Sequence, residues 1–166
     1  MTNQAYPSLD GIVPSWADIQ CTLSITGGTL IDMADIVGIK TGRKVEVGMQ
    51  EGISGGRTMA RTTGRVSYEA SMTIYRTGHL SLIKELGKTA PTRGNQKLLS
   101  LVHFDILIEH TPPGSTGIFR RKIKGCRFTG DDLDMKDGGS DPDKLELSLS
   151  VIEIVDIIDG QEYVLL

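Results

Sequence analysis

The sequence predicts an all-β sandwich or barrel with one short α-helix. Apolar and polar residues alternate with period two in about seven segments, the pattern of strands with one buried and one solvated face. The chain also contains 20 glycines, which favour turns and bulges over long helices. At 166 residues it is long enough for one domain with a substantial core.

We expect residues 1–15 to form an N-terminal arm and residues 16–166 to form the β domain. The arm contains Pro7, Gly11 and Pro14 and shows no sustained periodicity. It has no basic segment followed by an apolar one, so we do not expect a signal peptide. No apolar run approaches the ~20 residues that cross a bilayer, so we expect no membrane partner.

Three alternating segments lie in the first half of the β domain, at 16–25, 44–49 and 65–75. Residues 29–40 are expected to be irregular and to lead into a strand near Val37. In the third segment, strict alternation places two sets of side chains on opposite faces. The apolar set is Val66, Tyr68, Ala70, Met72 and Ile74, and the polar set is Ser67, Glu69, Ser71 and Thr73.

Residues 50–64, QEGISGGRTMARTTG, separate the second and third of these strands and predict a long loop. A loop of about fifteen residues without secondary structure is uncommon in a compact domain, and such loops are usually functional. Ordering its glycines costs conformational entropy, so we expect it to become ordered only against a partner.

The second half begins with the one predicted helix, at 77–88, with Thr77 as its cap and Gly87 at its C-terminal end. Strands follow at 98–109, where Asp105 is on the polar side, and at 118–128. A long alternating strand then separates an apolar set from a polar one. The apolar set is Leu145, Leu147, Leu149 and Val151, and the polar set is Lys144, Glu146, Ser148 and Ser150. Asp159-Gly160 predicts a two-residue hairpin turn before a short strand at 163–166.

We find no constellation of residues that predicts catalysis, a metal or a cofactor. The aspartates between 131 and 143 do not fit a calcium loop, because Asp137 stands where an EF-hand starting at Asp132 needs glycine. The three histidines lack the spacing of a zinc site, and neither Cys21 nor Cys126 has a CxxC partner. We expect both cysteines to be buried thiols.

A basic segment, RRKIKGCRF, allows two interpretations. Its charges could protect an edge strand from pairing with other sheets. They could instead dock on an acidic neighbour, which the Asp-rich turn of a second copy would supply. The net charge of −3 and the lack of interleaved aromatic residues argue against specific nucleic-acid binding.

The order of these segments resembles the tail tube proteins of tailed bacteriophages, which are related in fold to the tubes of type VI secretion and other contractile injection systems. The resemblance covers about residues 16–155. Besides the long loop and short helix, it rests on YEASMTIY at 68–75, FDILI at 104–108, GCRF at 125–128 and GSDP at 139–142.

The resemblance implies a structural, non-enzymatic subunit of a virion tail, assembled in the host cytoplasm. Subunits would form hexameric rings that close one shared barrel and stack into a tube, with the loop at 50–64 reaching an adjacent ring. Implied partners are further copies, the tape-measure, baseplate and tail terminator proteins, and a sheath where the tail is contractile. DNA would pass through the lumen during ejection without specific binding.

This resemblance, together with the alternation of the strands, gives two sets of candidate residues. Small hydroxyls and carboxylates suit a channel that must release DNA. The expected lumen-facing residues are Ser67, Glu69, Ser71, Thr73, Asp105, Glu146, Ser148 and Ser150. The expected inter-subunit residues are Arg57, Arg61, Arg65, Arg120, Arg121, Lys122 and Lys124.

Two other functions remain open at this point. One is a small closed β-barrel that encloses a ligand, which would need an internal cavity. The other is an enzyme on a flavin-type split barrel, which would need a phosphate-binding set that only Arg57, Arg61 and Arg65 could supply.

Overall fold

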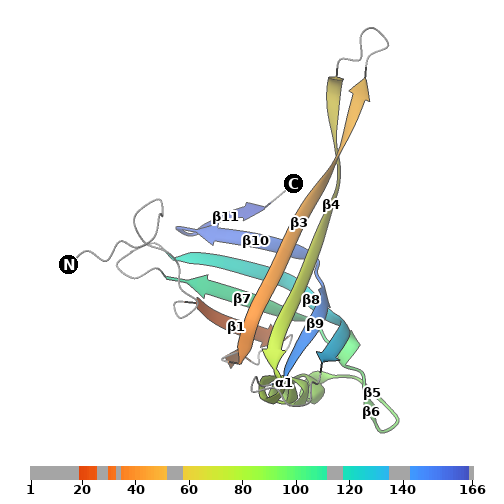
Figure 1. Cartoon of the computed structure of the whole chain (residues 1–166), viewed down its shortest axis with the longest axis vertical. Helices are drawn as coiled ribbons and strands as arrows, with labels where there is room; N and C mark the ends of the chain where they lie inside the picture. The colour runs from red at the N-terminus through yellow and green to blue at the C-terminus, as the bar shows by residue number, and fades with distance from the viewer. Residues whose placement is uncertain are drawn as a thin grey trace, which may run out of the picture.

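The computed structural model describes residues 19–25, 30–32, 35–51, 58–111, 118–134 and 143–164. These residues are mostly antiparallel β-strands with one α-helix, which confirms the predicted mostly-β class (Figure 1). The described strands of the single chain do not close into a barrel. No helix in these ranges is both long and apolar enough to cross a membrane.

The strands form two layers that share one long strand, β8 (Phe119–Asp134). The first part of β8 pairs with β7 and β10, and its last part pairs with β9. The first layer contains β1 (Ile19–Ile25), β2 (Leu30–Asp32), β7 (Phe104–His110), β10 (Glu153–Ile158) and β11 (Gln161–Val164). The second contains β3 (Ile36–Glu51), β4 (Thr58–Tyr75) and β9 (Lys144–Ser150).

The core lies between the two layers, where the alternating apolar residues of each strand meet. The first layer contributes Leu23, Ile106 and Ile123, and the second contributes Met72 and Leu147. The helix α1 (Arg76–Thr89) covers one end through Leu82 and Leu86. A small hairpin, β5 (Thr92–Arg93) and β6 (Gln96–Lys97), and the short 3₁₀ helix η2 (Leu99–Leu101) follow it.

The helix and the turn of the last hairpin agree with the sequence prediction. The strand after the turn is Gln161–Val164, where 163–166 was expected. Helix α1 extends the predicted span by one residue at each end. Its cap was predicted wrongly: Tyr75 is the N-cap, and the Thr77 hydroxyl donates to Asp35 instead, at 3.4 Å. Asp159 and Gly160 both have positive φ, 50° and 79°, as a type I′ turn between β10 and β11 requires.

Several strand boundaries differ from the prediction. The strand β3 is continuous where a strand near Val37 and a separate one at 44–49 were expected, and β8 continues to Asp134 beyond the expected end at 128. The expected loop at 50–64 is largely a hairpin, because the β3–β4 ladder continues to the Glu51–Thr58 pair; only 52–57 lie outside the described residues. The strand expected at 98–109 begins at Phe104, after η2. The long C-terminal strand divides at 151–152, where Ile152 donates its N–H to Lys124 and the chain passes from the second layer to the first.

Glycine 125 lies on β8 between the part in the first layer and the part in the second. Its φ is +65°, a conformation that residues with a Cβ rarely adopt, and its N–H donates to Asp105 Oδ1 at 2.9 Å. A Cβ at this position would lie 2.5 Å from the Cδ1 atom of Ile152. Because Ile152 is exposed and can move, the backbone conformation is the main obstacle to a larger residue.

We expect Gly125→Ala to lower the free energy of unfolding by about 1–2 kcal/mol, the usual cost of a left-handed conformation for an L-residue. Gly130→Ala on the same strand is the matched control, because no atom lies within 4 Å of its added Cβ. Urea unfolding of the two variants measures the difference. Equal stability of both variants would show that the bend does not depend on glycine.

Candidate assembly surfaces

The outward side of the second layer forms a continuous polar face, which we define as Ser67, Glu69, Ser71, Thr73, Glu146, Ser148 and Ser150. Ser71 pairs directly with Ser148, and Thr73 with Glu146, so the two strands place these side chains next to one another. Of the intervening residues, Ala70, Met72, Leu147 and Leu149 are buried in the core, and the half-buried Tyr68 packs against it. The structure thus brings together seven of the eight residues for which we expect a lumen position.

Asp105 is the exception, because β7 belongs to the first layer. Its carboxylate accepts the N–H of Gly125 and lies 3.6 Å from Lys122 Nζ. Asp105 lines a depression with Thr22, Ser24 and Glu109 on the outward side of that layer. It therefore does not share the polar face.

The polar face also carries basic residues that the sequence analysis did not include. Lys40 and Lys44 of β3 pair with Ser71 and Ser67, and both lysines are exposed. On the other side, Asp132 of β8 pairs with Glu146. The charge on this face is therefore mixed rather than negative. The alternation of Lys40, Gly42 and Lys44 was a sequence signal that could have revealed the two lysines.

The basic part of β8 lies inside the first layer, with β7 on one side and β10 on the other. The interpretation of an edge strand is therefore wrong. Each of its four predicted docking cations has a carboxylate partner within the chain. The partners are Glu109 for Arg120 at 3.3 Å, Asp156 for Arg121 at 2.6 Å, Asp105 for Lys122 at 3.6 Å and Glu153 for Lys124 at 3.2 Å.

One of these pairs, Arg121–Asp156, is also bonded to β3 of the second layer. Asp156 is buried on β10 and accepts hydrogen bonds from Arg121 through both carboxylate oxygens and from Arg43 of β3. Arg121 also donates to Thr41 of β3 at 2.8 Å. Burial alone would raise the pKa of Asp156, but the hydrogen bonds and charges of Arg121 and Arg43 outweigh it and lower the pKa. This cluster fastens β3 to the first layer.

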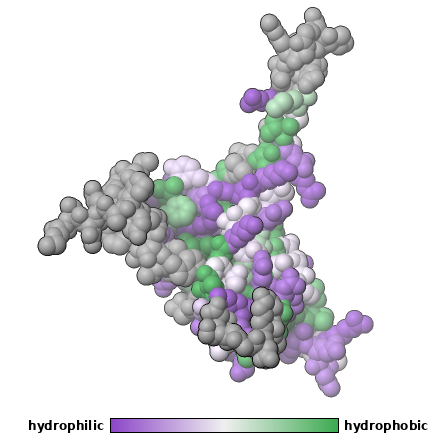
Figure 2. Space-filling view, viewed as in Figure 1, coloured by the Kyte–Doolittle hydropathy of each residue, from purple (hydrophilic) through white to green (hydrophobic). Residues whose placement is uncertain are grey.

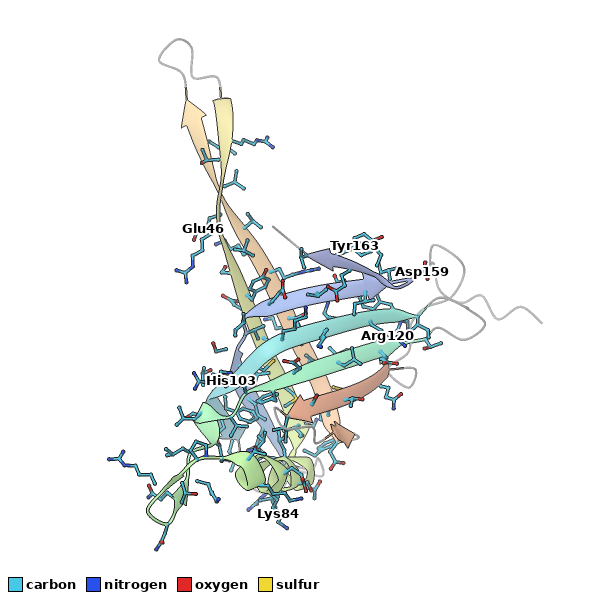
Figure 3. All side chains as sticks on the ribbon, turned by 180° about the vertical axis from the view of Figure 1, so that it is seen from behind. Glu46, Lys84, His103, Arg120, Asp159 and Tyr163 are labelled. Carbon is cyan, nitrogen blue, oxygen red and sulfur yellow. The ribbon has the colours of Figure 1, made fainter. Side chains whose placement is uncertain are left out.

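Beyond the cluster, β3 and β4 continue as an arm, which we define as residues 46–51 and 58–65. It extends away from the two layers (Figures 1 and 3, with Glu46 labelled at its base in Figure 3). All of its described side chains are exposed, including Arg61 and Arg65. Arg57, the third predicted contact in this segment, lies outside the described residues. The arm therefore contributes almost no buried surface to its own chain.

Several strands, among them β2, β3 and β11, leave one backbone edge without a partner in the described part of the chain. The strand β3 ends the second layer, and β2 and β11 end the first. Such edges offer N–H and C=O groups to a strand of another chain. Tyr163 and Val164 of β11 are also exposed.

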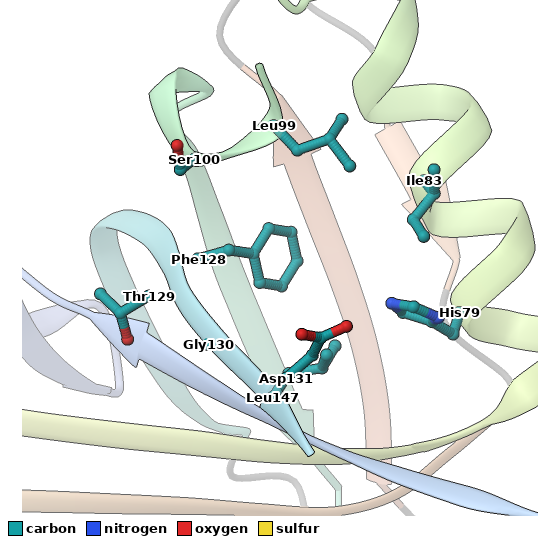
Figure 4. A pocket seen from close by; sticks show the side chains of 9 residues that line it. All are labelled: His79, Ile83, Leu99, Ser100, Phe128, Thr129, Gly130, Asp131 and Leu147. Carbon is teal, nitrogen blue, oxygen red and sulfur yellow. The ribbon is translucent and has the colours of Figure 1, made fainter. Parts of the chain in front are cut away.

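A groove of about 260 Å³ opens between α1, η2, β8 and β9 (Figure 4). Its walls are mainly apolar, from Ile83, Leu99 and Phe128, with His79 and Asp131 among them. The helix places His79 and Ile83 on one side, one turn apart, and β8 places Phe128 and Asp131 on the other (Figure 4).

The described residues contain no group of three or more His, Cys, Asp or Glu side chains that could hold a metal ion. Cys21 and Cys126 are buried and form no disulfide, which confirms the expected buried thiols. Burial, reinforced by the negative charge of Asp105, raises the pKa of Cys126 to about 12, so its reactive thiolate form is scarce at neutral pH.

No protein-family model and no curated protein sequence matches the chain. Solved structures do match its fold. A chain of the anti-feeding prophage baseplate, determined with six-fold symmetry, aligns with a TM-score of 0.58 at 10% identity, over 87% of this chain and 96% of the other. A chain of the sheath-tube complex of an extracellular contractile injection system aligns with a TM-score of 0.58 at 12% identity, over 96% and 94%.

The tail tube of SPP1 provides a third match, with a TM-score of 0.56 at 12% identity, over 87% of this chain and 78% of that one. These likenesses extend over most of the chain rather than over one motif. They show that the chain has a tail-tube-like fold.

Proposed function

We propose that this chain is the structural subunit of a phage tail tube, in which hexameric rings stack into a channel for DNA. The observation that carries the proposal is the tail-tube-like fold, which extends over at least 87% of the chain in each of the three structural matches. The exposed arm and the unpaired strand edges support it, because each is a surface that a further copy could cover.

In this proposal the second layers of neighbouring subunits join edge to edge, through β3, into one shared barrel. The polar face then lines the channel, and the core and first layer lie outside it. Small hydroxyls, mixed charges and the absence of aromatic side chains from the polar face suit a channel that DNA must cross without adhering. The proposal retains the tape-measure, baseplate and tail terminator proteins as partners, a sheath in a contractile tail, and a place in the virion.

The proposal is tested by the particles that the purified chain forms. We expect rings or tubes in negative-stain micrographs and masses at multiples of the subunit mass in solution. A monomer at all concentrations would contradict the proposed function, because a tube subunit must associate with itself.

We expect the double variant Glu69→Lys and Glu146→Lys to fold normally and to slow DNA ejection. Exposed strand positions usually change stability by about 0.5 kcal/mol or less, but each substitution replaces a negative charge with a positive one in every subunit of the channel wall. The channel wall would then attract the phosphates of the DNA, and more strongly at low salt. The measurement is the ejection rate of assembled particles at two salt concentrations.

The control for this prediction is Glu162→Lys, which makes the same change at an exposed position of β11 in the first layer. It should leave ejection unchanged. Equal rates for the double variant and the control would exclude the polar face as the channel wall.

A further inference from the structure

The groove beside α1 leaves apolar surface only partly covered by its own chain. Ile83, Leu99 and Phe128 are all half-buried, whereas Leu147 at the base of the groove is almost fully buried. Asp131 adds a negative charge to the lining and is exposed. An occupant that fits this site should present apolar side chains and a nearby positive charge.

The arm presents this combination. Val47 and Met49 are 51% and 62% exposed, and they lie two residues apart on β3, so they share one face of the hairpin. Arg61 is the direct cross-strand partner of Met49, which places its guanidinium on the same face. Figure 2 shows this apolar surface on the arm, clear of the two layers.

The groove and the arm lie at opposite ends of the molecule. In Figure 1 the arm points upward along the longest axis, and α1 closes the lower end. A chain cannot place its own arm in its own groove in this arrangement. In a head-to-tail row of copies, however, the arm of one copy points toward the groove end of the next.

We propose that the groove receives the arm of a second copy of this chain in the next ring. Val47 and Met49 pack against Leu99 and Phe128, and Arg61 faces Asp131. This inference rests on the proposed tube function and specifies the contact between its rings. The contact is heterologous, so it leaves a free arm at one end of a stack and a free groove at the other, and growth continues.

The test uses the full chain with Thr62→Cys and Ser100→Cys and a short bismaleimide cross-linker. Thr62 follows Arg61 on the arm and is not one of the residues placed in the contact. Both positions are exposed, and Ser100 lines the groove, so neither change disturbs the core. The native thiols Cys21 and Cys126 are buried and should not react. We expect tubes of the double variant to give a ladder of covalent multimers. Each single variant, and single rings of the double variant, should remain uncross-linked.

The outcomes separate this inference from the proposed function. Tubes without the ladder would overturn the arm-in-groove contact and leave the tube function standing. A covalent dimer from Thr62→Cys alone, or cross-links within single rings, would also overturn it, because the arm would then meet another arm or a neighbour in its own ring. A chain that forms no rings or tubes would contradict both.

A charge exchange provides a second test that does not depend on cross-linker length. We expect Arg61→Glu and Asp131→Arg each to raise the concentration needed for tube growth by about tenfold, because many copies of the pair act together in one ring interface. Combining the two restores the opposite charges and should restore growth. Failure of the combination to recover, with both single variants impaired, would show that the two residues do not meet.

Discussion

Replacing residues 46–65 with Asn-Gly should give a folded subunit that forms no tubes. The replacement leaves the Val45–Val66 pair at the end of a shortened hairpin, where Asn-Gly suits a two-residue turn. The described side chains of the arm are exposed, so the core loses no contacts with them. We expect a change of about 0.5 kcal/mol or less in the free energy of unfolding and a complete loss of stacked rings in micrographs.

The matched control for this replacement keeps the arm and changes its surface. Glu46→Gln removes an exposed charge at the base of the arm and should leave tube formation intact. Normal tubes from the shortened chain would contradict a role for the arm in assembly. Loss of cooperative unfolding would instead show that the arm supports the fold, against the burial pattern described above.

We expect Asp156→Asn to be far more destabilising than any of the surface changes. The substitution leaves Arg43 and Arg121 close together without the carboxylate that both contact. Breaking a buried ion pair costs about 3–5 kcal/mol, and partial exposure of the two arginines reduces the expected loss here to about 2–3 kcal/mol. The measurement is the free energy of unfolding in urea at pH 7.

The control is Glu153→Gln on the same strand, which breaks the more exposed pair with Lys124 and should cost less than about 1 kcal/mol. The pH dependence gives a second check. Because the pKa of Asp156 is lower in the folded chain than its ordinary value of 3.8, its contribution is present above that value and is lost as the pH falls through the folded pKa. The stability difference between the wild type and Asp156→Asn should therefore begin to narrow as the pH falls below 3.8. A constant difference down to pH 2 would refute the assigned pairing.

The strands and helix could be predicted because their signals are local. Alternation in 65–75 and 144–150 depends only on which residues meet the core, and Asp159-Gly160 suits the two positive φ angles of its turn. The polar face followed from the same alternation. Its continuity across β4 and β9 depended on strand pairing, which alternation within one strand does not determine.

The arrangement of charges could not be predicted for the same reason. Whether Arg121 meets solvent, a second copy or Asp156 depends on which strands flank β8, and those strands are distant in sequence. Asp105 shows the same limit, because its strand alternates as expected but lies in the other layer. The arm was predicted to be a loop because its sequence lacks the alternation of apolar and polar residues that marks a strand packed on a core. Its two strands are held together by backbone hydrogen bonds, which require no such alternation.

The most direct test of the tube proposal is a cryo-EM reconstruction of the particles formed by the wild-type chain. We predict stacked hexameric rings in which Glu69 and Glu146 face the central channel and the arm of each subunit contacts the next ring. A reconstruction with both glutamates on the outer wall, or a sample that remains monomeric under all assembly conditions, would contradict it.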